Sequence, residues 1–192
     1  MLNFFLPINS YDIVNNWILE TDTLVEIKNP RKTKSGDFKV IENKSIITIN
    51  NNLNPYAFLI TLTHELAHAY VYKKHYNLYP PHGKKWKNIF SNLLQILIHE
   101  DIFPSDILKP LIRYSKNPLA STFSDFDLSL TLSKYDEIKK LKILNLNRGT
   151  EFVFNNQIFI KEEKLRKRYR CINKKNNKVY FFHPLAEISV LE

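Results

Sequence analysis

Apolar side chains recur every three or four positions in three stretches of the first hundred residues, which predicts helices over 10–20, 55–75 and 83–97. The second helix is expected to begin at Asn54-Pro55, because asparagine is a preferred N-cap and proline is favoured at the first helical position. Its apolar stripe should comprise Phe58, Leu59, Leu62, Leu66, Ala69 and Tyr70. The first half of the chain is therefore predicted to form a helical core.

Strand patterns lie beside and beyond this helical core. Leu24–Ile27 and Ser45–Ile49 are short and rich in β-branched residues, and the basic stretch 28–39 between them contains proline and glycine, which predicts a loop or the tip of a hairpin. After residue 145 apolar and polar residues alternate, with Asn155-Asn156 and Asn176-Asn177 where turns belong. We expect about four or five strands in a small antiparallel β-domain.

Residues 103–144 differ from both regions, because they contain three prolines and no clear periodicity. The predicted organisation is a domain over 1–102, an irregular connection over 103–144 and a small basic β-domain over 145–192. Helices in one part of a chain and strands in another predict the α+β fold class.

The composition is that of a globular protein, with 44% hydrophobic and 24% charged residues. The single cysteine, Cys171, excludes an internal disulfide and a multi-cysteine zinc site. There is no apolar run of about eighteen residues that predicts a membrane span, and the first residues lack the basic start of a secretory signal. We therefore expect a monomeric cytoplasmic protein without membrane contact.

Residues 64–68 are His-Glu-Leu-Ala-His, a spacing that carries chemistry when it lies on a helix. The two imidazoles, at positions i and i+4, share one face and can reach the same ion. Zinc suits them because it accepts imidazole nitrogens, keeps an open position and acidifies its bound water. Glu65 lies about 100° round the helix from His64, where it can address that water. We predict one Zn²⁺ per chain, with His64 and His68 as ligands and Glu65 as the general base.

A catalytic zinc requires a third protein ligand. His82 is favoured because Pro80-Pro81 turns the chain back just before the next helix begins at Gly83. His75 is expected to be too far away, about 10 Å beyond His68 along the helix axis. The remaining candidates are Glu100, Asp101, His99 and His183.

The motif His64-Glu65-Leu66-Ala67-His68, followed by His82-Gly83-x-x-Trp86, resembles the SprT-like zinc metalloprotease domain over about residues 1–100. The resemblance implies a zincin-like helical core with a few short strands, zinc ligands at His64, His68 and His82, and Glu65 as catalytic base. The related Spartan proteases degrade proteins crosslinked to DNA, and their activity depends on DNA. Many relatives carry a four-cysteine zinc ribbon, which this chain lacks; its end is similar to that of bacterial members without the ribbon.

The charge distribution indicates a second kind of partner. The net charge is +9, and nine of the basic residues lie between 161 and 178, with Tyr169, Tyr180 and Phe181 among them or close by. This combination is typical of surfaces that hold phosphates and stack on bases, although a lysine-rich edge strand protected from aggregation has the same composition. The candidate nucleic-acid-binding residues are Lys164, Arg166, Lys167, Arg168 and Arg170. On a strand, the three arginines would share one face.

These observations favour a zinc metallopeptidase that cleaves protein substrates, including proteins bound or crosslinked to DNA. A non-catalytic DNA-binding module with a structural zinc is the first alternative, but such a site does not need Glu65. A metal hydrolase acting on a non-peptide bond is the second, because the motif specifies the attacking water better than the bond attacked.

Overall fold

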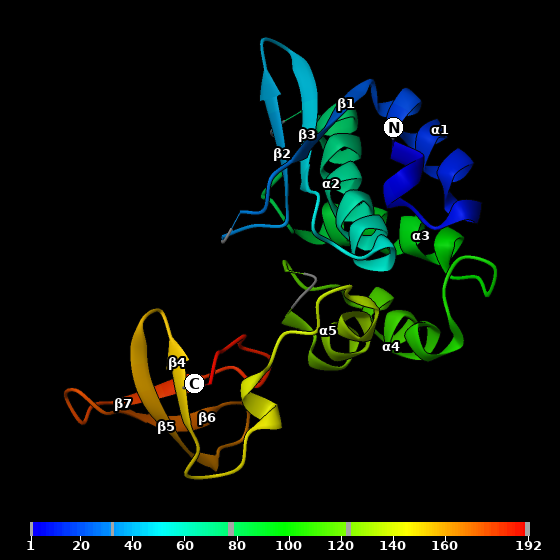
Figure 1. Cartoon of the computed structure of the whole chain (residues 1–192). Helices are drawn as coiled ribbons and strands as arrows, with labels where there is room; N and C mark the ends of the chain where they lie inside the picture. Colours follow the sequence, from blue (N-terminus) through cyan, green and yellow to red (C-terminus); the bar gives the residue numbers. More distant parts are fainter. Residues whose placement is uncertain (1, 32, 77–78, 122–123, 191–192) are drawn as a thin grey trace. The chain divides into compact units, whose positions relative to one another are not determined.

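The computed structural model describes residues 2–31, 33–76, 79–121 and 124–190 (Figure 1). The chain divides into two compact units, Met1–Glu137 and Ile138–Glu192. The described residues form five α-helices and two sheets, one of three strands and one of four, which confirms the α+β class. None of the helices in these residues has the length and apolar character that crossing a membrane requires.

A three-stranded sheet forms one side of the first unit. β1 (Thr23–Lys28) pairs in parallel with β3 (Lys44–Asn50), and β2 (Gly36–Ile41) pairs antiparallel with β3. The strand order is therefore β1-β3-β2, and β2 is an edge strand. β1 and β3 match the two predicted strands, whereas part of β2 falls in the stretch 28–39 that was expected to be a loop or the tip of a hairpin.

The hairpin that creates β2 depends on two residues of left-handed conformation. Glu42 and Asn43 have φ values of 48° and 63°, the geometry of a two-residue turn whose twist matches that of the flanking strands. β2 has only three large apolar residues, Phe38, Val40 and Ile41, so its sequence gives a weak strand signal. The loop or hairpin tip predicted for 28–39 therefore extends too far, because residues 36–39 belong to β2.

The helix α2 (Pro55–His75) has the bounds predicted from the sequence. Its N-cap is Asn54, whose side chain accepts a hydrogen bond from the Ala57 N–H at 3.0 Å. The side-chain amide of Asn54 also donates to the Leu132 carbonyl at 2.9 Å. One residue thus starts α2 and ties it to a segment some eighty positions later in the chain.

Burial on α2 extends around its whole circumference over residues 57–67. The helix packs against β2 and β3 on one side and against α1 (Tyr11–Thr21) and α3 (Lys84–Leu97) on others. Figure 1 shows α2 between the three-stranded sheet and α1. The expected single apolar stripe is therefore too narrow, since the neighbours also cover the side that carries His64 and Glu65.

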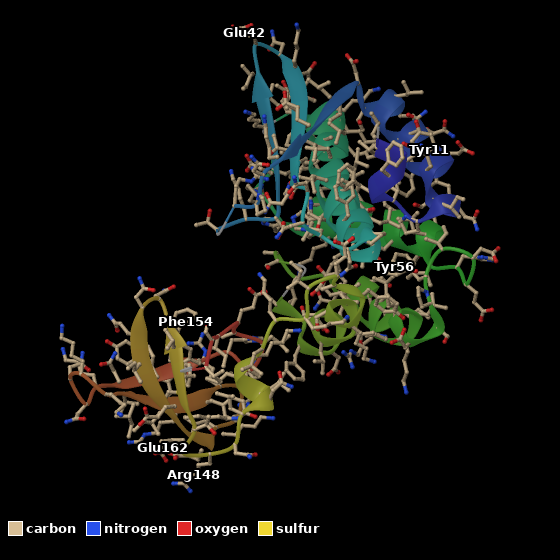
Figure 2. All side chains as sticks on the ribbon, in the orientation of Figure 1. Tyr11, Glu42, Tyr56, Arg148, Phe154 and Glu162 are labelled. Carbon is tan, nitrogen blue, oxygen red and sulfur yellow. The ribbon has the colours of Figure 1, made fainter. Side chains whose placement is uncertain are left out.

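The segment predicted as an irregular connection, 103–144, contains two helices of the first unit, α4 (Ser105–Ser115) and α5 (Phe126–Leu132). Both contribute buried residues to the core, namely Ile107, Leu111, Leu128 and Leu132. The prolines mislead here, because Pro104 is the N-cap of α4 and Pro110 is accommodated within it. Tyr56 of α2, labelled in Figure 2, contacts the rings of Phe103 and Tyr135 and joins this segment to the core.

The second unit is an antiparallel sheet in the order β4-β5-β6-β7. Its strands are Glu151–Phe154, Gln157–Lys164, Tyr169–Asn173 and Val179–Phe182. Asn155 and Asn156, with φ values of 47° and 59°, form the predicted turn between β4 and β5. The core consists of Ile143, Phe152, Phe159, Cys171 and Phe182. The small β-domain thus has a hydrophobic centre of its own.

Candidate metal centre

Three histidines, two from α2 and one from the turn before α3, converge on one point. The Nε2 atoms of His64 and His68, both on α2, each lie 3.1 Å from Nε2 of His82, which lies in the turn just before α3. Among the described residues, this is the only cluster of at least three histidine, cysteine or acidic side chains close enough to hold a metal ion. The structure therefore brings together the three residues expected to be ligands.

The nitrogen separations agree with metal coordination better than with hydrogen bonding. A neutral imidazole Nε2 carries either a proton or a lone pair, so His82 cannot make a full hydrogen bond to both neighbours through the same atom. Metal–nitrogen bonds of about 2.0–2.1 Å at tetrahedral angles place the nitrogens about 3.3 Å apart. A single cation would satisfy all three nitrogens, and the two separations of 3.1 Å are close to this spacing.

Aromatic rings hold the three imidazoles in place. The ring of Trp86, on the first turn of α3, lies 4.6–5.3 Å from the rings of all three histidines and is fully buried. His68 is stacked between Trp86 and Phe38 of β2, with interplanar angles of 28° and 12°. The Nδ1 atom of His64 is buried and has no hydrogen-bond partner among the described residues. Ring packing therefore fixes His64 in place of the usual second hydrogen bond of a metal-bound histidine.

Burial keeps the histidines neutral, as metal ligands must be. It lowers the pKa of His64 to about 3 and that of His68 to about 4, and the charges of neighbouring histidines act in the same direction. Burial also lowers the pKa of His82. All three side chains are thus uncharged at neutral pH and available to a cation.

Glu65 is the carboxyl group buried beside this cluster. Burial raises its pKa to about 8, and the negative charge of Asp37 contributes in the same direction. A hydrogen bond from the Phe38 backbone N–H and the positive charges of Arg31 and Lys34 oppose this shift. A bound divalent cation would also favour the carboxylate. The carboxylate is the form that can accept a proton, as a general base must.

The three histidines and Glu65 line one cavity of about 620 Å³, a size typical of ligand-binding sites. Its wall also includes Tyr72 and Tyr79, along with Gly36 and Phe38 of β2. The sequence analysis did not identify Gly36 or Phe38 as part of the site. It named Trp86 only as part of the motif that carries the family resemblance. Gly36 offered the best clue, because the chain has only three glycines and each needs a reason.

The other candidates for the third ligand lie elsewhere. Glu100 and Asp101 are exposed beyond the end of α3, and Nδ1 of His99 accepts a hydrogen bond from the Asp101 N–H at 3.3 Å. The His75 ring packs edge-on against Tyr79. His183 belongs to the second unit, where its Nδ1 accepts a hydrogen bond from the Leu185 N–H. None of them joins the cluster of three.

His82 adopts a backbone conformation that is unusual for its residue type. Gly83 N–H donates to the Pro80 carbonyl at 3.1 Å, which closes a turn with Pro81 second and His82 third. The φ of His82 is 58°, and the third position of such a turn ordinarily calls for glycine or asparagine. A histidine at this position, where glycine would fit without strain, favours a role for its side chain in the cluster.

We expect a His82→Gly variant to lose the metal while its metal-free form is as stable as the metal-free parent or more so. Glycine accepts a positive φ without strain, which should raise the melting temperature by about 2–4 °C. Zinc titration and thermal unfolding of the metal-free proteins would measure the two effects. His75→Ala and Glu100→Ala serve as controls that should retain zinc; a larger loss from Glu100→Ala would contradict the assignment of His82.

The basic residues predicted to bind nucleic acid lie mainly in a loop. β5 ends at Lys164 and β6 begins at Tyr169, so Arg166, Lys167 and Arg168 occupy the connection between them, closed by the Leu165 N–H to the Arg168 carbonyl. The expectation that three arginines share one strand face was wrong, because the chain turns there. Arg170 is on β6 and lies 3.6 Å from Glu163.

Lys161, counted with this basic stretch, is buried in the second unit. Its ammonium group lies 4.0 Å from the centre of the Tyr169 ring and donates to the Leu146 carbonyl. It therefore belongs to the core of that unit and is not available to a phosphate.

Comparisons with protein-family models, with curated proteins and with solved structures found no match to this chain.

Proposed function

We propose that this protein is a zinc-dependent peptidase with a zincin-like, SprT-like metalloprotease domain, acting on protein substrates. The observation that carries the proposal is the convergence of three neutral imidazoles, with a buried carboxyl group from α2, on one open cavity. The His64–His68 pair on a helix beside a small sheet, with His82 from the turn before the next helix, is the arrangement that the resemblance implies.

His64, His68 and His82 would hold the zinc through their Nε2 atoms. When bound, zinc polarises a substrate carbonyl and lowers the pKa of water to about 7. Glu65 accepts the proton of the attacking water at a carboxylate oxygen and delivers it to the leaving amine. Trp86 and Phe38 keep the imidazoles oriented and exclude water from their far sides.

The ligand set favours a catalytic site over a structural one. Structural zinc sites are closed by four protein ligands, whereas catalytic sites have three and an open position. No fourth histidine, cysteine or acidic side chain joins the cluster in the part of the chain that the structure describes. The three histidines line the same cavity as Glu65, which leaves room there for water and substrate.

The direct test is metal analysis of the purified protein together with digestion of casein, with and without single-stranded DNA. We expect zinc to be retained, casein to be cleaved, and cleavage to stop after chelation and return with zinc. Zinc without cleavage of any protein would favour the non-catalytic alternative. Absence of bound zinc would refute the proposal.

We further propose DNA as a partner, held by Lys164, Arg166, Lys167 and Arg168. These four side chains are exposed and none forms an ion pair with another described residue, in contrast to several other basic residues of the second unit. Figure 2 shows Arg148 beside Glu162, an ion pair of 3.1 Å that neutralises its charge. Phe181, directly opposite Arg170 in the sheet, is 52% exposed and offers a surface for base stacking.

Replacing Lys164, Arg166, Lys167 and Arg168 by alanine should weaken DNA binding regardless of sequence. The log–log salt dependence should flatten by about 0.7–0.9 for each phosphate that the variant no longer holds. The matched control removes two neutralised charges, Arg148 and Lys174, whose partners are Glu162 and Glu151. If the quadruple variant and the control bound DNA with the same affinity and salt dependence, these four residues would have no role in DNA binding.

A further inference from the structure

The free edge of β2 runs beside Glu65, and the register of the hairpin shows how. Ile41 and Lys44 close the two-residue turn as a hydrogen-bonded pair. From there, non-hydrogen-bonded and hydrogen-bonded residue pairs alternate along the two strands, and Phe38 belongs to a non-hydrogen-bonded pair. The Asn50 N–H to Ser35 carbonyl bond of 2.9 Å fits this alternation at the far end. The backbone N–H of Phe38 therefore points away from β3, and it donates to the Glu65 carboxyl group.

Gly36 lies opposite the same carboxyl group with no space for a side chain. A Cβ atom at this position would lie 2.7 Å from Oε1 and 2.9 Å from Cγ of Glu65. It would also lie 2.8 Å from the methyl carbon of Thr61, one turn earlier on α2. Contacts this short cannot persist, so any larger residue at position 36 must displace β2, Glu65 or both.

The next inward-facing residue of β2 supports a metal ligand. Phe38 faces α2 on the same side of the sheet as Gly36, and its ring is nearly parallel to that of His68, 6.4 Å away. One strand therefore contacts Glu65 through a glycine and a backbone N–H, and His68 through an aromatic ring.

We propose that β2 positions the general base, with Gly36 as a positioning residue that lets the strand approach close enough for the Phe38 N–H to hold the Glu65 carboxyl group. The role of Glu65 as a base rests on the proposed function, whereas the placement of its side chain does not. In this role Gly36 acts through Glu65.

Activity gives the first test. In the zinc-loaded protein, Gly36→Ala should lower kcat by about 10²-fold with little change in KM or zinc affinity, approaching the loss expected from removal of a general base. In a Glu65→Gln background the same substitution should cause no further loss, because the group it displaces no longer acts. Gly149→Ala, at a positive φ with nothing nearby, is the matched control that lowers stability and leaves kcat unchanged.

Stability gives a second test that does not require cleavage. Gly36→Ala should lower the melting temperature of the zinc-loaded parent by about 5 °C, as overpacking does. The loss should shrink in a Glu65→Ala background and vanish when Thr61→Ser is added, because the three close atoms are then gone. The inference would be overturned if Gly36→Ala lowered the melting temperature equally in the parent, in Glu65→Ala and in Glu65→Ala/Thr61→Ser. It would also be overturned if the triple variant Gly36→Ala/Glu65→Ala/Thr61→Ser did not fold. Relief of the loss in a protein that cleaves nothing would refute the peptidase and support the placement of Glu65.

Discussion

A His64→Ala variant should retain less than about a tenth of the zinc that the parent binds, and its peptidase activity should be undetectable. The parent should bind one zinc per chain, because the described residues contain one suitable cluster. Two remaining imidazoles form a site too weak to survive dialysis, since zinc sites in proteins use at least three protein ligands. Metal analysis after dialysis measures the loss.

His75→Ala is the matched control for this experiment, because His75 lies on the same helix outside the cluster. It should retain zinc and activity. Full occupancy in His64→Ala, or two zinc ions per parent chain, would show that the metal is bound elsewhere.

A Glu65→Gln variant should bind zinc as the parent does and cleave protein about 10²–10⁴ times more slowly. The amide has nearly the shape of the carboxyl group, so the space beside Gly36 remains filled, but it cannot accept a proton from water. Rates on one protein substrate, at equal zinc content, measure the effect. The control is Glu100→Gln, an exposed change outside the cavity. Cleavage by Glu65→Gln at the parent rate would refute the mechanism.

The features predicted best are those that depend on neighbours in the sequence. The bounds of α2 follow from Asn54, Pro55 and the apolar periodicity, and the positions of His64 and His68 follow from helical spacing. His82 could be ranked first because Pro80 and Pro81 restrict the chain just before it. These inferences need only a few consecutive residues, and the structure agrees with the geometry of each.

The features predicted worst depend on contacts between distant segments. β2 is stabilised by pairing with β3 and packing against α2, although apolar and polar residues alternate only weakly along it. The helices α4 and α5 are stabilised by burial of Leu111 and Leu128 against the core, which outweighs the prolines that suggested an irregular chain. Gly36 is needed only because Glu65 lies opposite, and no local pattern reveals that contact.

Burial around the whole circumference of α2 over residues 57–67 has a consequence for how this protein tolerates change. In α3, buried positions such as Trp86, Phe90 and Leu94 recur at helical spacing among exposed ones, so acceptance of random substitutions should rise and fall with each turn. Over residues 57–67 every side chain is enclosed, so substitutions should be poorly accepted at every position, without the periodic variation expected in α3. A library of single substitutions would therefore show residues 57–67 as an uninterrupted block, in which His64 would not stand out from its neighbours.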